Sequence, residues 1–186
     1  ITGGEGDDDL YGGAGADWIS GGDGADYLFG ESSHDQLYGG AGNDTLRGEF
    51  GTDTVSGQSG DDLLVLYGSD GQWVEGGSGN DRIMGAGRHP DDDVVIHSSG
   101  NHTIFAGAGD DTLISGSGND RLEGGSGTDW LLQEISGTQV LSDTLLTGLG
   151  IDTLSSIDQV HLIGGSESEL IDASAFTRGP VTLEGR

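Results

Sequence analysis

Aspartate recurs in this chain every nine residues over most of its length, and each of these aspartates stands two residues before an aliphatic side chain. Gln72 and His102 occupy the two places of the series that lack Asp. The chain has no cysteine and its histidines follow no such spacing, so the regular donors are oxygen atoms. A cation bound by such donors is a hard one, and calcium accepts about six to eight oxygens in flexible geometry. The series comprises Asp8, Asp17, Asp26, Asp35, Asp44, Asp53, Asp62, Asp81, Asp93, Asp111, Asp120 and Asp129.

The charge of the chain limits the classes of partner that it can bind. It has 186 residues, with 6 Lys+Arg against 33 Asp+Glu and a formal net charge of -27. Such a surface repels nucleic acid and anionic membranes and attracts cations. No apolar run approaches the roughly 18 residues that a membrane span needs. The absence of cysteine excludes disulfides and fits a secreted bacterial-type protein that is stabilised by other means.

Low hydrophobicity with high net charge is also typical of disorder. A disordered chain needs no fixed phase, however, and here fourteen successive places in the series are aliphatic. One extra residue precedes Val74, and three extra residues precede Val95. The aliphatic places are Leu10, Ile19, Leu28, Leu37, Leu46, Val55, Leu64, Val74, Ile83, Val95, Ile104, Leu113, Leu122 and Leu131.

Each block predicts a turn of six residues followed by a short strand of three, whose central aliphatic side chain points inward. Two blocks then form one coil of about 18 residues, and fourteen blocks form about seven coils. The buried side chains form too thin a core to offset the ordering of the backbone, and the aspartate rows repel one another. A bound cation would add stability to the fold and reduce the repulsion between aspartates, and calcium is the cation we expect.

The blocks GGEGDDDLY, GGAGADWIS, GGDGADYLF and GGAGNDTLR resemble the RTX, or hemolysin-type, calcium-binding nonapeptide repeat. The resemblance implies an all-β, right-handed parallel β-roll, with calcium held between stacked turns by the Asp carboxylates and by backbone carbonyls of the glycine-rich turns. It also implies export by type I secretion and folding outside the cell. The implied carbonyl donors are Gly4, Gly6, Gly13, Gly15, Gly22, Gly24, Gly40, Gly42, Gly77, Gly79, Gly107, Gly109, Gly116, Gly118, Gly125 and Gly127.

Stacking places alternate blocks in the same row. One predicted row carries Asp8, Asp26, Asp44, Asp62, Asp81, His102 and Asp120, and the other carries Asp17, Asp35, Asp53, Gln72, Asp93, Asp111 and Asp129. We expect calcium to be lost near His102 in the first row and near Gln72 in the second. Glu31 and Ser33 replace both signature glycines before Asp35, which weakens the expectation of a site there. We expect roughly six to ten calcium ions.

Residues 66–75 and 85–105 interrupt the pattern and bring Trp73, His97 and His102 into one region. These three residues are candidate ligand contacts, although a decayed repeat with a tolerated insertion is the favoured interpretation. Exposed aromatic residues, among them Trp18 and Trp130, could stack on sugar rings. An ancillary glycan-binding or adhesive module of a larger extracellular enzyme or adhesin is therefore the alternative function.

The glycine-rich repeat pattern of the sequence ends after Leu132. Short apolar and polar alternations predict a calcium-poor solenoid extension or cap over residues 133–186, following the calcium-binding roll of residues 1–132. Asp152, Asp158 and Asp172 are interpreted as turn residues. The predicted core of this part comprises Leu145, Leu154, Ile157, Val160, Leu162, Ile171, Phe176, Val181 and Leu183.

These observations favour a non-enzymatic calcium-binding module of an extracellular protein, secreted or at the cell surface. Its expected partners are calcium ions and neighbouring modules of a longer chain, because the sequence ends TLEGR, where another glycine-rich block could begin. An enzyme with its site in residues 66–105 is disfavoured, because no carboxylate pair there can be told apart from calcium ligands.

Overall fold

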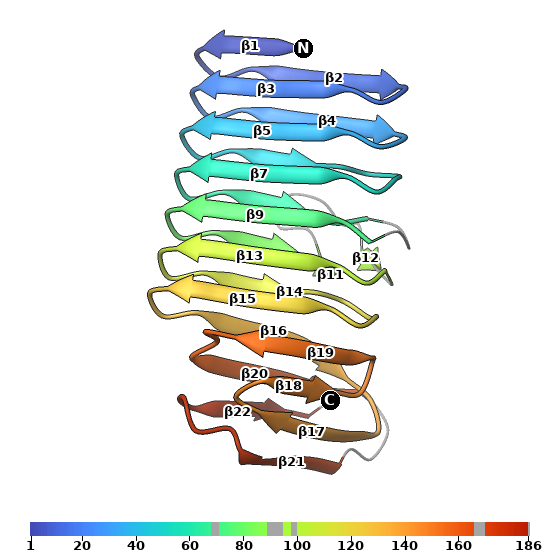
Figure 1. Ribbon diagram of the computed structural model, residues 1–186, viewed down its shortest axis with the longest axis vertical. Helices are drawn as coiled ribbons and strands as arrows, with labels where there is room; N and C mark the ends of the chain where they lie inside the picture. Colours follow the sequence, from blue (N-terminus) through green and yellow to red (C-terminus); the bar gives the residue numbers. More distant parts are fainter. Residues whose placement is uncertain (68–70, 89–94, 98–99, 166–169, 186) are drawn as a thin grey trace.

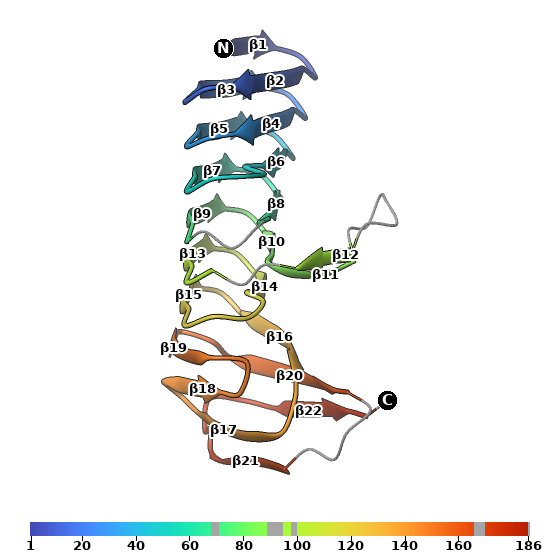
Figure 2. The same cartoon turned by 90° about the vertical axis from the view of Figure 1, so that its right-hand side faces the viewer.

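The chain winds into an elongated stack of coils in which two long sheets face each other, as the two views in Figure 1 and Figure 2 show. The computed structural model describes residues 1–67, 71–88, 95–97, 100–165 and 170–185. Regular secondary structure in these residues is β-strand, and none of them forms a helix that could cross a membrane. The predicted all-β parallel roll is confirmed, because consecutive coils pair in parallel through residue 135.

The first sheet has eleven strands, in the spatial order β1 (Thr2–Glu5), β3 (Trp18–Asp23), β5 (Gln36–Ala41), β7 (Thr54–Ser59), β9 (Trp73–Ser78), β13 (Thr103–Ala108), β15 (Arg121–Ser126), β19 (Ile151–Ser155), β18 (Leu145–Thr147), β17 (Thr138–Ser142) and β21 (Leu170–Ala175). The second sheet has nine: β2 (Asp9–Ala14), β4 (Tyr27–Ser32), β6 (Thr45–Arg47), β8 (Leu63–Val65), β10 (Arg82–Met84), β14 (Thr112–Ile114), β16 (Trp130–Ile135), β20 (Gln159–Gly164) and β22 (Val181–Glu184). A separate hairpin joins β11 (Ala86–Arg88) and β12 (Val95–His97).

One aliphatic side chain from each sheet fills each coil. Successive strands place these residues in register, as where Leu28 pairs with Leu46 and Ile19 with Leu37. From Ile19 to Leu131 the members of the series on the roll are fully buried, because alternate strand residues point inward. Many strands are longer than the predicted three residues: β3 continues through the first glycines of the next block, so the backbone ladder also binds the start of each turn.

Glycine is required in the turns because successive coils approach each other there through their peptide groups. Gly22 has a φ of 125°, and a Cβ at this position would lie 2.0 Å from the carbonyl oxygen of Gly4 in the preceding coil. Gly40 stands in the same relation to Gly22, also at 2.0 Å. A side chain fits neither the backbone angle nor the space, so the coil spacing depends on glycine at these places.

The hairpin of β11 and β12 corrects the predicted repeat register. The expectation that Val95 continues the buried series is wrong, because Val95 lies opposite Arg88 in an antiparallel pair. Ile83 pairs directly with Leu113. Equivalent residues across the insertion are 30 apart instead of 18, so the hairpin and its loops add 30 − 18 = 12 residues. It projects sideways from the stack (Figure 2).

The last part of the chain departs from the parallel pattern. β19, β18 and β17 pair antiparallel in turn, whereas β20 continues in parallel from β16. Of the predicted core residues there, Leu154, Ile157, Val160, Leu162 and Phe176 are buried. Leu145, Ile171 and Val181 are only partly buried, and Leu183 is wrong as a core residue, since it is 57% exposed on the edge strand β22. The boundary at residue 132 remains a prediction, and β16 runs through it.

A ladder of side-chain hydrogen bonds ties the coils together at the position just before the aspartates. Asn43 accepts the N–H of Asp61 at 3.0 Å, Asp61 accepts that of Asn80 at 2.8 Å, and Asn80 accepts that of Asp110 at 2.8 Å. On the other edge, the side chain of Asn101 accepts the N–H of Asn119, and the side chain of Asn119 accepts the N–H of Ile151. These bonds use only protein atoms, so they contribute to stacking whether or not a cation is present.

We expect Asn43→Ala to lower the free energy of unfolding by about 0.5–1 kcal/mol, because the N–H of Asp61 loses its protein acceptor. Urea unfolding in saturating calcium measures the change. Thr52→Ala is the matched control, since Thr52 has the same place in its block and its side chain accepts no such bond among the described residues. Equal losses in the two variants would contradict a role for the ladder.

Candidate metal centre

The aspartates of the series form two continuous rows along the stack, one at each edge where strand follows turn. In each row the N–H of one residue donates to a side chain in the next coil, as from Asp26 to Oδ1 of Asp44 at 2.8 Å. We call the first set the complete row: Asp8, Asp26, Asp44, Asp62, Asp81, Asp111 and Asp129. We call the second set the interrupted row: Asp17, Asp35, Asp53, Gln72, His102, Asp120 and Asp152.

The row assignments after residue 85 therefore differ from the predicted ones. Gln72 and His102 lie in one row, where the N–H of Gln72 donates to Nδ1 of His102 at 3.1 Å. The repeat count placed them in different rows because it treated the hairpin as one block, which is half a coil. Asp93 lies outside the described residues. The consequence is that one row carries a carboxylate in every coil, while the other lacks one in two consecutive coils.

Most carboxylates from the second coil onward accept an N–H at Oδ1 and leave Oδ2 without a hydrogen-bond partner. The Oδ2 atoms are buried and accept no hydrogen bond. A buried, unpaired anionic oxygen is strongly unfavourable unless a proton or a cation meets it. The residues in this state are Asp8, Asp17, Asp26, Asp35, Asp44, Asp62, Asp81, Asp111, Asp120 and Asp129.

The unpartnered oxygen faces a cradle of backbone. A Cβ built on Gly21 would lie 2.2 Å from Oδ2 of Asp26 and 2.5 Å from the carbonyl oxygen of Gly39. Gly39 repeats this arrangement with Asp44 and the carbonyl of Gly57, at 2.3 and 2.7 Å. Carboxylate and carbonyl oxygens thus converge where no side chain can enter. A hard cation fits this donor set, and the first glycine of each block belongs to it although only the second and third glycines were predicted as donors.

The predicted carbonyl donors lie in the same turns at positive φ. The carbonyl oxygens of Gly22 and Gly24 point at the turn one coil further on, 2.0 Å from where a Cβ of Gly40 or Gly42 would be. The turn before Asp35 keeps this conformation although its glycines are replaced, since Glu31 and Ser33 have φ values of 73° and 101°. Asp35 is therefore positioned like its neighbours, with 1% exposure.

Burial raises the pKa of several of these carboxyl groups. The pKa of Asp62 rises to about 7, chiefly by desolvation, with repulsion from Asp81 and Asp44 adding to the effect. Desolvation raises the pKa of Asp44, Asp81 and Asp111 to about 6 in each case. Without a cation, these four carboxyl groups therefore take up protons at a higher pH than exposed aspartates do.

The interruption replaces charge with neutral groups. His102 is 1% exposed, and burial lowers its pKa to about 4, so the imidazole is neutral. Gln72 is 2% exposed and donates through Nε2 to the carbonyl of Tyr67 at 3.1 Å. Of the predicted ligand contacts, Trp73 is 49% exposed on the first sheet and does not share a surface with His102. His97 ends β12, and its side chain lies outside the described part of the chain.

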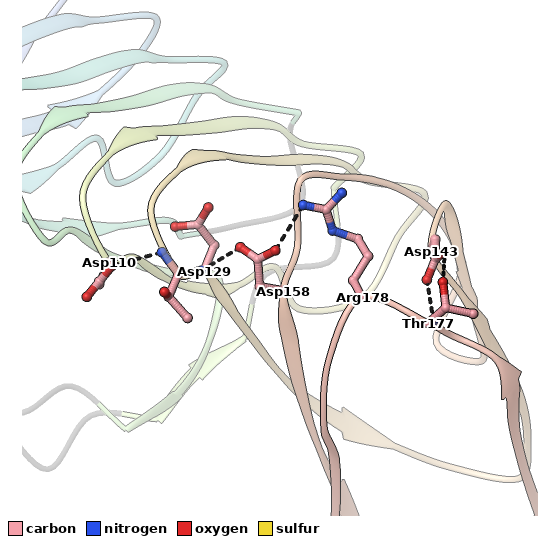
Figure 3. A network of polar contacts seen from close by, with 7 residues as sticks. Asp110, Asp129, Asp143, Asp158, Thr177 and Arg178 are labelled. Atoms are coloured by element: carbon pink, nitrogen blue, oxygen red, sulfur yellow. Dashed lines mark hydrogen bonds and ion pairs between the residues drawn. The ribbon is translucent and has the colours of Figure 1, made fainter.

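Both rows continue past the last predicted aspartate. Asp120 donates its N–H to Oδ1 of Asp152 at 3.0 Å, and Asp129 donates to Oδ2 of Asp158 at 3.2 Å. Figure 3 shows Asp158 between Asp129 and Arg178, whose Nη2 donates to Oδ1 of Asp158 at 2.9 Å. A protein cation thus stands at the end of the complete row. Asp152 and Asp158 each stand two residues before an aliphatic residue, as the aspartates of the series do. Their interpretation as simple turn residues overlooked this signal.

No group of three or more His, Cys, Asp or Glu side chains in the described residues is placed to hold a metal ion. Each coil supplies one carboxylate to a row, so an ion must take its remaining oxygens from the backbone. Carboxylate and carbonyl oxygens without imidazole or thiolate are the donors that calcium prefers.

Stacked parallel coils with a glycine-rich turn and one buried carboxylate per turn define a β-roll of the calcium-binding class. The model of the RTX calcium-binding nonapeptide repeat matches the chain four times, over residues 2–37, 30–64, 66–87 and 97–131. The chain belongs to this family. The gap between the last two matches coincides with the hairpin of β11 and β12. No curated protein matches the chain.

We expect the calcium-free chain to lose structure as pH rises from about 4 to about 7. The folded-state pKa of Asp62 and Asp44 lies above the usual value of 3.8, so the folded form binds more protons in this window and its stability falls as they dissociate. Circular dichroism in EGTA at pH 5 and pH 7.5 measures it. Salt at about 0.5 M, which screens general repulsion, is the control. More structure at pH 7.5 than at pH 5 would contradict the burial argument.

Proposed function

We propose that this chain is a calcium-switched folding module of an exported protein, which stays largely unfolded where calcium is scarce and folds outside the cell. The observation that carries the proposal is the set of buried Oδ2 atoms that have no hydrogen-bond partner and lie beside backbone carbonyls. Calcium at these places would remove the repulsion within each row and the desolvation cost of each carboxylate. No catalytic role is proposed.

The calcium ligands we propose are the aspartates of the two rows with the carbonyl groups of the adjoining glycine turns. The complete row would bind calcium through its length, from Asp8 to Asp129, and end at the Asp158–Arg178 ion pair. The interrupted row would bind before Gln72 and after His102, where Asp120 begins a new run. Roughly six to ten ions remain the expected number.

Binding of calcium to the folded form alone makes folding depend on its concentration. At 100 times the dissociation constant, each site adds about 2.7 kcal/mol to the stability. Several sites together can exceed the marginal stability of an ordinary domain. A chain with a net charge of -27 and a core of only one aliphatic side chain per strand needs such a contribution. Calcium would supply it once the chain reached a calcium-rich exterior.

We expect the far-UV circular dichroism of the chain at pH 7.5 to change from coil-like in EGTA to β-like at millimolar calcium, cooperatively, because sites in one row share turns. Magnesium at the same concentration should have little effect, since it demands a tighter octahedral geometry. A fully β-like spectrum in EGTA at this pH would overturn the switch.

We expect Asp62→Asn to lower the calcium content by about one ion per chain, because the variant keeps the Oδ1 acceptor for the N–H of Asp44 but loses the anionic oxygen. Equilibrium dialysis of the folded variant measures the content. Gln72→Asn is the matched control, because this place in the interrupted row has no carboxylate to lose. An unchanged calcium content in the Asp62 variant would remove Asp62 from the ligand set.

A further inference from the structure

Beyond the aspartate rows, the outer face of the second sheet carries a column of aromatic and basic side chains. Tyr11, Phe29 and Arg47 are successive partners on β2, β4 and β6. The rings of Tyr11 and Phe29 stack with centroids 4.9 Å apart and an interplanar angle of 4°. The Arg47 guanidinium lies 5.4 Å from the centroid of Phe29. Neighbours on both sides of the Phe29 ring thus hold it in place.

This surface already holds one guanidinium. That of Arg47 also lies 4.8 Å from the ring centroid of Tyr67 and donates to the hydroxyl of that residue. Its Nε pairs with Oε1 of Glu49 at 3.0 Å. Two aromatic rings and one carboxylate therefore form a working receptor for a basic side chain, built from residues of the roll itself.

A pocket of about 400 Å³ adjoins this site and is also lined by aromatic rings and carboxylates, but none of the described basic residues lines it. It is lined by Tyr11, Phe29, Glu31, Ser32, Glu49 and Phe50. Glu31 stands one coil before Glu49 at the same place in the block. The backbone of Phe50 is fixed, because its N–H donates to the carbonyl of Glu31 at 3.0 Å and its carbonyl accepts the N–H of Ser33 at 2.9 Å.

The two glutamates occupy backbone positions that favour glycine. Glu31 and Glu49 have φ values of 73° and 68°, while Gly13, one coil before Glu31, has a φ of 94°. Residues with a Cβ adopt such angles only with steric strain. Strain kept in two successive coils at one pocket marks the pair as a candidate for function.

We propose that this pocket binds an arginine or lysine side chain of a partner polypeptide. Glu31 is exposed and pairs with no basic residue in the described part of the chain, so its carboxylate is available to a cationic head group. Tyr11 and Phe50, 56% and 68% exposed, provide apolar walls for the aliphatic stem. Even about ten bound calcium ions would leave the formal net charge of -27 negative, so the calcium-loaded chain still attracts a basic partner.

Charge and ring placement favour this occupant over a sugar. A sugar stacks on an open aromatic face, whereas the Phe29 ring has Tyr11 on one side and Arg47 on the other. Glu31 lines the pocket with a carboxylate that is complementary to a cation, while Glu49 lines it already paired with Arg47.

Isothermal titration of the calcium-loaded chain with a tetra-arginine peptide at about 0.15 M salt tests the proposal, with a tetra-citrulline peptide as the uncharged counterpart. We expect tetra-arginine to bind and Glu31→Gln and Phe50→Ala each to weaken binding about fivefold, with an unchanged β-like spectrum in calcium. The matched control is Glu5→Gln, which removes one exposed charge from the first sheet and should change the affinity less than about twofold.

Equal weakening by Glu5→Gln and Glu31→Gln would show general charge attraction and overturn the pocket. Equal affinity for the citrulline peptide would overturn the role of the cation. Binding of chitohexaose or cellohexaose that Phe50→Ala abolishes, without binding of tetra-arginine, would show a glycan site in its place.

Discussion

A carboxylate buried in nearly every turn constrains the whole of this structure. Asp26 and Asp44 illustrate it: each satisfies one oxygen through the coil before it and turns the other toward backbone carbonyls. Burying such an anionic oxygen without a partner is strongly unfavourable, so a cation beside it stabilises the fold. With 6 basic residues against 33 acidic ones, the chain cannot neutralise the rows from within, and Arg178 meets only the end of one of them.

The repeat made the roll predictable because one physical rule acts in every coil. Leu28, Leu37 and their equivalents had to face inward at an interval of nine, and Gly22 and Gly40 had to admit the neighbouring peptide groups. Local spacing therefore predicted the buried column and the aspartate rows over residues 2–83. The donor set could be predicted less completely, because the carbonyl of Gly39 reaches the turn of Gly21 and Asp26 through stacking and not through spacing within a block.

Most of the errors share one cause, which is antiparallel pairing between strands that follow each other directly in the sequence. Val95 fits the aliphatic pattern as well as Ile83 does, and only the antiparallel partner Arg88 reveals a hairpin. That single miscount exchanged the rows and separated Gln72 from His102. In the C-terminal part, β17 to β19 reverse direction, so alternation correctly predicted strands but not their order, and it placed Leu183 in a core that ends before it.

The interruption at Gln72 and His102 has a mechanical consequence. The two long edges of the roll differ there, since one keeps a carboxylate in every coil and the other has a neutral amide and imidazole joined by one N–H bond of 3.1 Å. Cations bound by carboxylates would therefore join these coils along one edge only, so the contribution of calcium to stacking would be one-sided at the level of the projecting hairpin.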